Sequence, residues 1–254
     1  MGHLEEIVAF LNSTFNVANL GDFPNAFNGL QLANDGHIDK VVGAVDANPA
    51  SITRAIEQKA DLLCVHHGLY WRGVQPMVGH IYDMFRKAMD ANLAIYSLHL
   101  PLDSHPKLGH NASIAHQLNL KEAGYFCNYF QQNCGIVCDG SDETTASLEE
   151  RIKVLFPCGH HALLYGPHQL NKIGIVSGSG GQELLNEMVK CHIDTLITGE
   201  IRYSALSFAQ LHHLNIFACG HYATECFGIK KLLALIHDHF HLPCEFLNFD
   251  GMKL

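Results

Sequence analysis

The feature that most constrains the fold of this chain is an internal repeat. KVVGAVDAN leads into a helical segment and then DLLCVHHG, whereas KIGIVSGSG leads into a second helical segment and then DTLITGE. In this alignment Lys40 matches Lys172, and Asp61 matches Asp194. Each half continues with another helical segment and a third apolar run, LAIYSLHL in the first half and LNIFACGH in the second. The repeat predicts two β-α-β-α-β units.

Alternating strands and amphipathic helices predict an α/β fold, in which parallel strands are joined by right-handed crossovers. A helix is expected over residues 3–15, another over 229–240, and a last strand in CEFLNF. The segment between the repeats contains YFCNYFQQNCGIVCDG, which suggests β structure, the helical pattern SLEERIKVLF and a possible strand in HALLYG. We assign residues 1–125 plus 221–254 to a first α/β domain and 126–220 to a second.

Composition limits the class of protein. The 254 residues are 48% hydrophobic, which is enough for a packed core. The formal net charge of −9 lacks the basic surplus that duplex nucleic acid requires, so nucleic acid is an unlikely partner. No apolar run approaches the ~18 residues that cross a bilayer, and the N-terminal residues carry acids where a secretory signal carries bases. We therefore expect a cytosolic protein without membrane partners, whose nine cysteines stay reduced.

Three short motifs at the ends of apolar runs carry imidazole or carboxylate groups. VHHG contains His66 and His67, HLPLD contains Asp103, and GHYATE contains His221 and Glu225. Parallel sheets bind ligands at the carboxyl ends of their strands, where all three motifs are expected to lie. This donor set suits zinc, manganese, iron, nickel or cobalt. Five ligands exceed the need of one structural zinc and leave open positions on two ions, so the motifs predict a dinuclear site with room for chemistry.

Each motif also has a simpler interpretation. His66 and His67 could be ordinary polar residues at a strand end, although adjacent ligands at a chain turn favour two separate ions. His221 and Glu225 lie one helical turn apart and so share a face at a helix start. Alternatively, Thr224 or Glu225 could cap that helix.

Two more residues are candidates for proton transfer. Pro101 is expected to exclude a regular helix in HLPLD, so His99 and Asp103 should not be stacked by helical spacing. Asp103 is then a better candidate than His99 for a metal ligand. His99 is expected to orient the metal ligands without binding the metal itself, or to transfer a proton. Glu200 closes the second half's counterpart of the VHHG region and is expected to act as a general base or to orient a ligand.

Two loops are candidates for substrate contact. In SGSGG (177–181) the backbone amides at a helix start could hold a phosphate, although a tight strand-to-helix turn needs glycine anyway. Tyr70, Trp71 and Arg72 follow VHHG directly and could form an aromatic and cationic wall for a nucleobase or phosphate. The alternative is a packed loop.

The motifs NGLQ, VHHG, HLPLD, LGHNA, ITGE and GHYATE together resemble the YbgI-like dinuclear-metal family, known as GTP cyclohydrolase I type 2 homologues. The resemblance spans nearly the whole chain, whose length is that of the short bacterial members. It implies two interlocked α/β domains and a toroidal homohexamer whose metal sites face an internal cavity. It also implies the same five metal ligands, His66, His67, Asp103, His221 and Glu225. Phe27 departs from the family pattern, which commonly has proline before NGLQ.

These features predict a metal-dependent hydrolase. Two divalent ions bridged by Glu225 and a water would lower the pKa of that water and hold a hydroxide against an electrophilic carbon or phosphorus. The expected substrate is a nucleotide or a similar phosphorylated heterocycle, and the resemblance implies opening of the GTP imidazole ring with loss of formate. The alternative is a non-catalytic metal-binding scaffold or metallochaperone ring, in which the ions serve stability or delivery.

Overall fold

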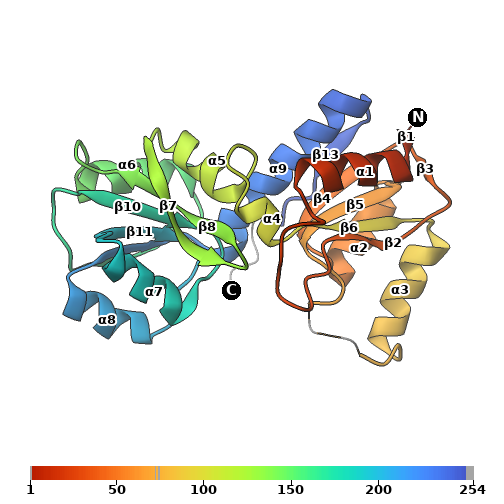
Figure 1. Cartoon of the computed structure of the whole chain (residues 1–254). Coiled ribbons are helices and arrows are strands. Elements are labelled where there is room, and N and C mark those ends of the chain that lie inside the picture. Colours follow the sequence, from red (N-terminus) through yellow and green to blue (C-terminus); the bar gives the residue numbers. More distant parts are fainter. Residues whose placement is uncertain (1, 72, 74, 250–254) are drawn as a thin grey trace. The chain divides into compact units, whose positions relative to one another are not determined.

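A computed structural model of the chain describes residues 2–71, 73 and 75–249 (Figure 1). The chain divides into two compact units. Unit 1 runs to Leu102 and resumes over Gly228–Phe249, whereas unit 2 spans Asp103–Phe227. These limits differ from the predicted domain boundaries at 125 and 220. Residues after 103 belong to unit 2 because α5 (His110–Gln117) packs against strands β8 (Gln132–Asp139) and β10 (Lys172–Val176).

Unit 1 is built on a five-stranded sheet with the order β13-β4-β5-β6-β2. Its strands are β4 (Val41–Asp46), β5 (Leu62–His67), β6 (Ala94–Ser97), β13 (Cys244–Phe246) and the antiparallel β2 (Gly29–Leu32). Its helices are α1 (Leu4–Thr14), α2 (Pro49–Glu57) and α3 (His80–Asp90), and a two-stranded sheet pairs β1 (Gly2–His3) with β3 (His37–Ile38). The helix expected over 229–240 begins earlier, because α9 spans His221–Phe240 and its first turns belong to unit 2.

Unit 2 is built on a six-stranded sheet with the order β7-β8-β10-β11-β12-β9. The remaining strands are β7 (Glu122–Tyr129), β9 (His161–Leu164), β11 (Thr195–Thr198) and β12 (Asn215–Ala218). Its other helices are α6 (Thr145–Leu155), α7 (Gly181–Lys190) and α8 (Ser204–His212). In the described part of the chain, no helix has the length and apolar character needed to span a membrane.

The two halves of the sequence repeat have the same hydrogen-bonded framework. Strands β4, β5 and β6 are parallel in unit 1, as are β10, β11 and β12 in unit 2. Asp61 Oδ2 accepts the backbone N–H of Lys40 at 2.9 Å, and the matching Asp194 Oδ2 accepts the N–H of Lys172 at 3.2 Å. The paired lysines and aspartates therefore mark the start of equivalent strands, which confirms the predicted α/β fold.

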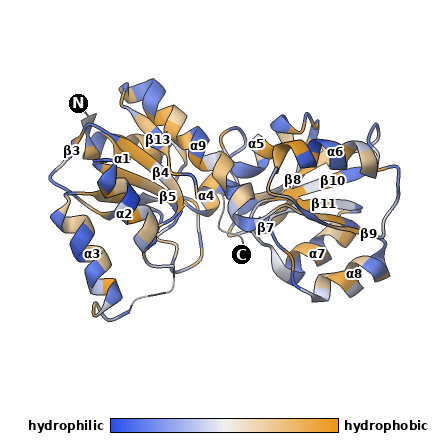
Figure 2. Ribbon diagram, turned by 180° about the vertical axis from the view of Figure 1, so that it is seen from behind, coloured by the Kyte–Doolittle hydropathy of each residue, from blue (hydrophilic) through white to orange (hydrophobic). Residues whose placement is uncertain are grey.

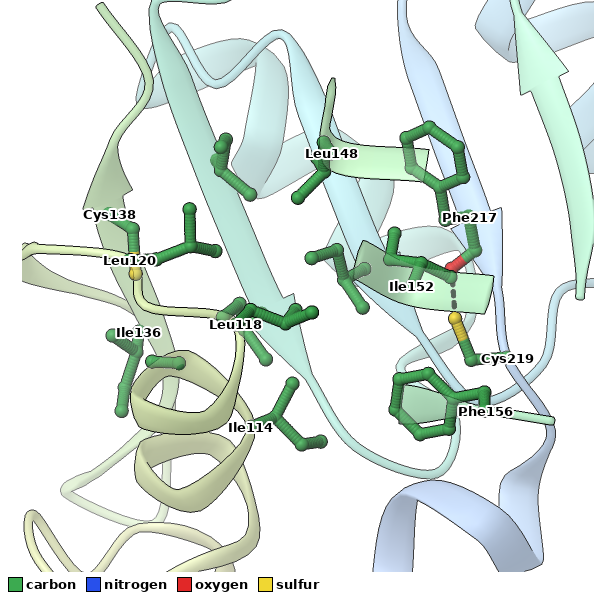
Figure 3. Close-up of a cluster of buried hydrophobic side chains, with 14 of the residues drawn as sticks. Ile114, Leu118, Leu120, Ile136, Cys138, Leu148, Ile152, Phe156, Phe217 and Cys219 are labelled. Atoms are coloured by element: carbon green, nitrogen blue, oxygen red, sulfur yellow. Dashed lines mark hydrogen bonds between the residues drawn. The ribbon is translucent and has the colours of Figure 1, made fainter. Parts of the chain in front are cut away.

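The sheet of unit 2 is buried on both faces. Neighbouring residues of a strand point to opposite faces, and Ile216 and Phe217 of β12 accordingly belong to different hydrophobic clusters. Figure 3 shows the cluster that contains Phe217, in which Ile114 of α5 and Ile152 of α6 cover one face. In Figure 2 the helices that cover the sheets carry both hydrophobic and hydrophilic residues, as amphipathic helices do.

HLPLD forms a one-turn helix, α4 (Leu100–Asp103), so the expectation that Pro101 excludes a helix is wrong. Leu102 N donates to His99 O at 2.8 Å. Proline is accepted in the first turn of a helix because the N–H it lacks would have no partner there. The turn carries the chain from His99 to Asp103, at the point where unit 2 begins.

Helix α9 packs so closely against β4 that no side chain would fit at Gly43. A Cβ at this position would lie 2.7 Å from Ile229 Cγ2 and 2.8 Å from Leu233 Cδ1. Gly43→Ala is therefore expected to lower the free energy of unfolding by ~1–3 kcal/mol through overpacking. Urea denaturation would measure the change, with Met89→Ala on the exposed side of α3 as the control. A Gly43→Ala protein within ~0.5 kcal/mol of wild type would contradict this close packing.

Candidate metal centre

Three imidazoles meet at the carboxyl ends of two neighbouring strands in unit 1. β5 ends in His66 and His67, and His99 follows β6. One ligand atom of each lies within 4.8 Å of the others. His66 is fully buried and His99 is 7% exposed. The parallel pairing of β5 with β6 brings the three rings together, and such a cluster could hold a metal ion.

Hydrogen bonds at Nδ1 orient the imidazole rings of His66 and His67. His66 Nδ1 lies 3.0 Å from Leu98 O, and His67 Nδ1 lies 2.9 Å from Asp46 Oδ1. A carbonyl and a carboxylate can only accept, so Nδ1 carries the proton of each neutral ring. The lone pair is then on Nε2, which is the arrangement that acceptors behind metal-bound histidines produce. The residues present therefore fit a transition-metal ion.

His99 is held in the same way by Asp22, a contact that the sequence did not predict. Asp22 Oδ1 lies 2.8 Å from His99 Nδ1, and Asp22 Oδ2 accepts the N–H of Leu100 at 2.9 Å and an amide N–H of Asn28 at 2.8 Å. Burial would raise the pKa of the Asp22 carboxyl, but the hydrogen bond and electrostatic interaction with His99, together with the hydrogen bond from Asn28, lower it. Asp22 is therefore ionised and fixes the orientation of His99.

The NGLQ motif supports the histidine-bearing loops. Asn28 Oδ1 accepts the N–H of His99 at 2.6 Å, and Gln31 Oε1 accepts the N–H of Leu69 at 2.6 Å. A Cβ at Gly68 would collide with the Gln31 side chain, so a larger residue at the end of VHHG would displace this amide. Phe27 has a φ of 46°, a conformation that proline cannot adopt. The backbone at position 27 therefore excludes the proline that the family commonly has there.

Asp103 lies in a hydrogen-bonded pocket of unit 2. It is 8% exposed, and Ser177 Oγ donates to Asp103 Oδ1 at 2.8 Å. Ser177 N donates to Asn111 Oδ1 at 2.7 Å, which ties the start of the SGSGG loop to α5. His110 is fully buried, with a ligand atom within 4.8 Å of one from Asp103. His110 was not among the candidate ligands predicted from the sequence, although this histidine lies in LGHNA, one of the six motifs that carry the family resemblance.

The SGSGG loop has the geometry of a tight turn. Gly178 and Gly181 have φ values of 62° and 63°, which favour glycine. Its first residue, Ser177, positions Asp103, so the loop has a supporting role that needs no phosphate. Phosphate binding here stays a prediction.

His221 and Glu225 form a second cluster in unit 2. His221 Nε2 lies 3.0 Å from Glu225 Oε1, and His221 Nδ1 lies 3.1 Å from Glu200 Oε1. Burial lowers the pKa of His221, but hydrogen bonds and charge attraction from Glu225 and Glu200 outweigh it and raise the pKa to about 9. At neutral pH this imidazole carries a proton that faces Glu225. A cation bound by both side chains would replace that proton.

The contacts at the start of α9 involve both residues of the capping interpretation, and the ligand and capping roles stay predictions. The first turn of α9 contains no acidic residue, and the Glu225 side chain faces His221. Thr224 instead ties the helix start to the loop after β10, because its Oγ1 accepts the N–H of Gly178 at 3.0 Å. Glu200 orients His221 through Nδ1, which favours the orienting role over the general base.

Trp71 lies against the histidine cluster of unit 1. Its ring centroid is 4.5 Å from that of His99 and 5.2 Å from that of His67. Tyr70 points elsewhere, toward Phe27 at 5.4 Å. Trp71 is thus the member of the predicted aromatic wall that reaches the site, and Arg72 lies outside the described residues.

The fold and these clusters define an α/β protein whose histidine and acidic side chains could hold metal ions. The model of the Duf34/NIF3 (NGG1p interacting factor 3) family matches residues 3–250, so the chain belongs to this family. This match confirms the resemblance carried by the six motifs.

Curated relatives and solved structures agree with this assignment. A protein of Deinococcus radiodurans is 34% identical over 96% of this chain and 92% of its own length, and one of Halobacterium salinarum is 34% identical over 92% and 94%. Both are named GTP cyclohydrolase 1 type 2 homolog. The structure of protein ybgI, of unknown function, has a TM-score of 0.87 at 26% identity and covers 100% of both chains. TTHA1606 from Thermus thermophilus has a TM-score of 0.86 at 30% identity and covers 99% of this chain and 100% of its own.

Proposed function

We propose that the protein is a dinuclear metal-dependent hydrolase that acts on a nucleotide or a related phosphorylated heterocycle. The observation that carries this proposal is the convergence of His66, His67 and His99. All three have Nδ1 held by an acceptor, which directs the Nε2 lone pairs toward a ligand. Structural histidines have no need of such an arrangement on three neighbouring rings.

The proposed ligands of the two ions are His66, His67, Asp103, His221 and Glu225. Each of these side chains is either oriented by a neighbouring residue, as Asp103 is by Ser177, or buried in the protein. Mixed nitrogen and oxygen ligation of this kind suits zinc, manganese, iron, nickel or cobalt. His110 is a further donor close to Asp103.

When bound, two divalent ions would activate a water molecule for attack on an electrophilic carbon or phosphorus. His99 Nε2 could accept a proton in that step, because Asp22 holds the proton of the ring on Nδ1 and stabilises the imidazolium that forms. Glu200 would keep His221 oriented through Nδ1. This division of roles resembles a histidine base with a carboxylate behind it.

The names of the relatives support hydrolysis of a cyclic amidine, which is the chemistry of opening the imidazole ring of GTP. By the same family resemblance we propose a toroidal homohexamer in the cytosol.

Metal analysis of the purified protein should find about two divalent ions per chain at saturation. Incubation of the loaded protein with a panel of nucleotides should release a ring-opened product, detected by loss of purine absorbance and by formate. A stoichiometry fixed at one with metal in excess would refute the dinuclear proposal. Two readily exchanged ions without turnover of any nucleotide would favour the alternative, a metal-binding scaffold or metallochaperone.

A further inference from the structure

Two exposed aromatic rings flank His99 in unit 1. The centroids of Trp71 and Phe23 lie 4.5 and 6.1 Å from that of His99, and 6.4 Å from each other. Trp71 is 40% exposed and Phe23 is 45% exposed. The two rings come from loops far apart in the sequence, so their meeting beside the histidine cluster is a property of the folded unit.

Hydrogen bonds hold both loops, one to His99 and the other to Gln31 of β2. Phe23 follows Asp22, whose carboxylate holds His99 and also accepts the N–H of Phe23 at 2.7 Å. Trp71 follows Leu69, whose N–H is held by Gln31 at 2.6 Å. Phe23 therefore adjoins the residue that orients His99, and Trp71 lies two residues after a backbone amide that Gln31 holds.

The ring contacts of Trp71 leave it suited to stacking. It meets His99 at 61°, Phe23 at 82° and His67 at 42°, and none of these three contacts is parallel. A tryptophan with two fifths of its surface exposed has room for a flat partner. The electron-rich indole stacks well on the electron-poor ring of a nitrogen heterocycle.

We propose that Trp71 is the stacking platform for the heterocyclic base of the ligand, with Phe23 closing one side. This inference rests on the proposed function, since it places the heterocycle of the proposed substrate next to His99. A flat nitrogen heterocycle has polar edges that can face the imidazole nitrogens, whereas an apolar protein surface would bury those nitrogens without compensation. A heterocyclic base is therefore a more favourable partner for Trp71 than the surface of a second copy of the chain.

Trp71 is the only tryptophan in the sequence, so it reports on its own site. Guanosine added to the zinc-loaded protein should change the intrinsic tryptophan fluorescence in a saturable way, and ribose 5-phosphate should not. Zinc is a suitable metal because it has no redox chemistry of its own. Equilibrium dialysis with labelled guanosine should give the same dissociation constant.

Substitution separates stacking from packing. Trp71→Leu should weaken guanosine binding by roughly tenfold or more, and Trp71→Phe should recover most of it, because a smaller ring still stacks. Tyr203→Leu, which removes an 89% exposed ring from unit 2, should bind guanosine as wild type does. Metal content and oligomeric state should be unchanged in all three variants, as measured by elemental analysis and light scattering.

Several results would overturn the platform. Equal guanosine affinity in wild type and Trp71→Leu would do so, as would weaker binding explained by lost zinc. A change of oligomeric state with guanosine affinity retained would assign the rings to a contact between copies. Because binding is measured without turnover, a protein that binds guanosine through Trp71 but hydrolyses no nucleotide would support the platform while refuting the hydrolase.

Discussion

Glu225→Gln is expected to bind at most one divalent ion tightly, against the two proposed for the wild-type protein, and to lack the proposed hydrolytic activity. A carboxylate has two oxygens and can contact both ions, whereas an imidazole nitrogen binds one. Without the negative charge, the repulsion between two close cations is compensated less well. The loss should therefore affect both metal positions together and exceed the loss from any single histidine substitution.

The surroundings of Glu225 make this substitution a test of charge. The side chain is 5% exposed and faces His221 Nε2, and a Cβ at Gly178 would collide with Glu225 Oε1. Glutamine has nearly the same shape, so it should fit this space without displacing the loop. In the metal-free variant the pKa of His221 should fall from about 9, because its strongest partner is no longer charged.

Titration of Glu225→Gln with manganese or zinc would measure both affinities, and Glu150→Gln on the exposed side of α6 is the matched control. The melting temperature should differ from wild type mainly when metal is present, since a ligand that binds only the native state stabilises it. Two sites of wild-type affinity in Glu225→Gln would show that the residue is not a bridge.

Much of the fold followed from the sequence because its signals are local or periodic. The matched pairs Lys40 with Lys172 and Asp61 with Asp194 marked equivalent strands, and the structure gives both aspartates the same hydrogen-bonding role. The ends of apolar runs located His66 and His67 at the end of β5. Strand ends are visible in a sequence because hydrophobicity changes there.

The supporting residues could not be predicted because their partners are remote in sequence. Asp22 and His99 are 77 residues apart, and Asp46 and His67 are 21 apart. Spacing identifies a ligand on one strand but does not show which carboxylate will lie behind it. The α4 helix was missed for a different reason, since the rule that proline breaks helices does not apply to a first turn.

Truncation of Asp103 or His221 is expected to remove metal while leaving the fold intact. Asp103 ends α4 and His221 begins α9, and neither residue belongs to the hydrophobic clusters of unit 2. Asp103→Ala leaves Ser177 Oγ without this acceptor, which should cost ~1 kcal/mol of stability. The circular dichroism spectrum and cooperative melting should therefore be retained while the bound metal falls below two ions per chain.

Ser177→Ala is expected to have a metal affinity between those of wild type and Asp103→Ala. It keeps the Asp103 carboxylate and removes only the hydroxyl that orients it, so metal affinity should fall by ~10–100-fold rather than be lost. Metal affinity should then decrease in the order wild type, Ser177→Ala, Asp103→Ala. A general loss of structure would instead lower the melting temperature of the metal-free proteins in the same order.

His221→Ala tests the other cluster and should also lose metal. His221 Nε2 and Glu225 Oε1 lie 3.0 Å apart, so removal of the imidazole leaves one metal ligand where there were two. His168→Ala, an exposed histidine of unit 2, is the control and should keep full occupancy. Full occupancy in His221→Ala would remove GHYATE from the metal site. Glu225 lies on the same helix face as His221, so that result would also argue against Glu225 as the residue that bridges the two ions.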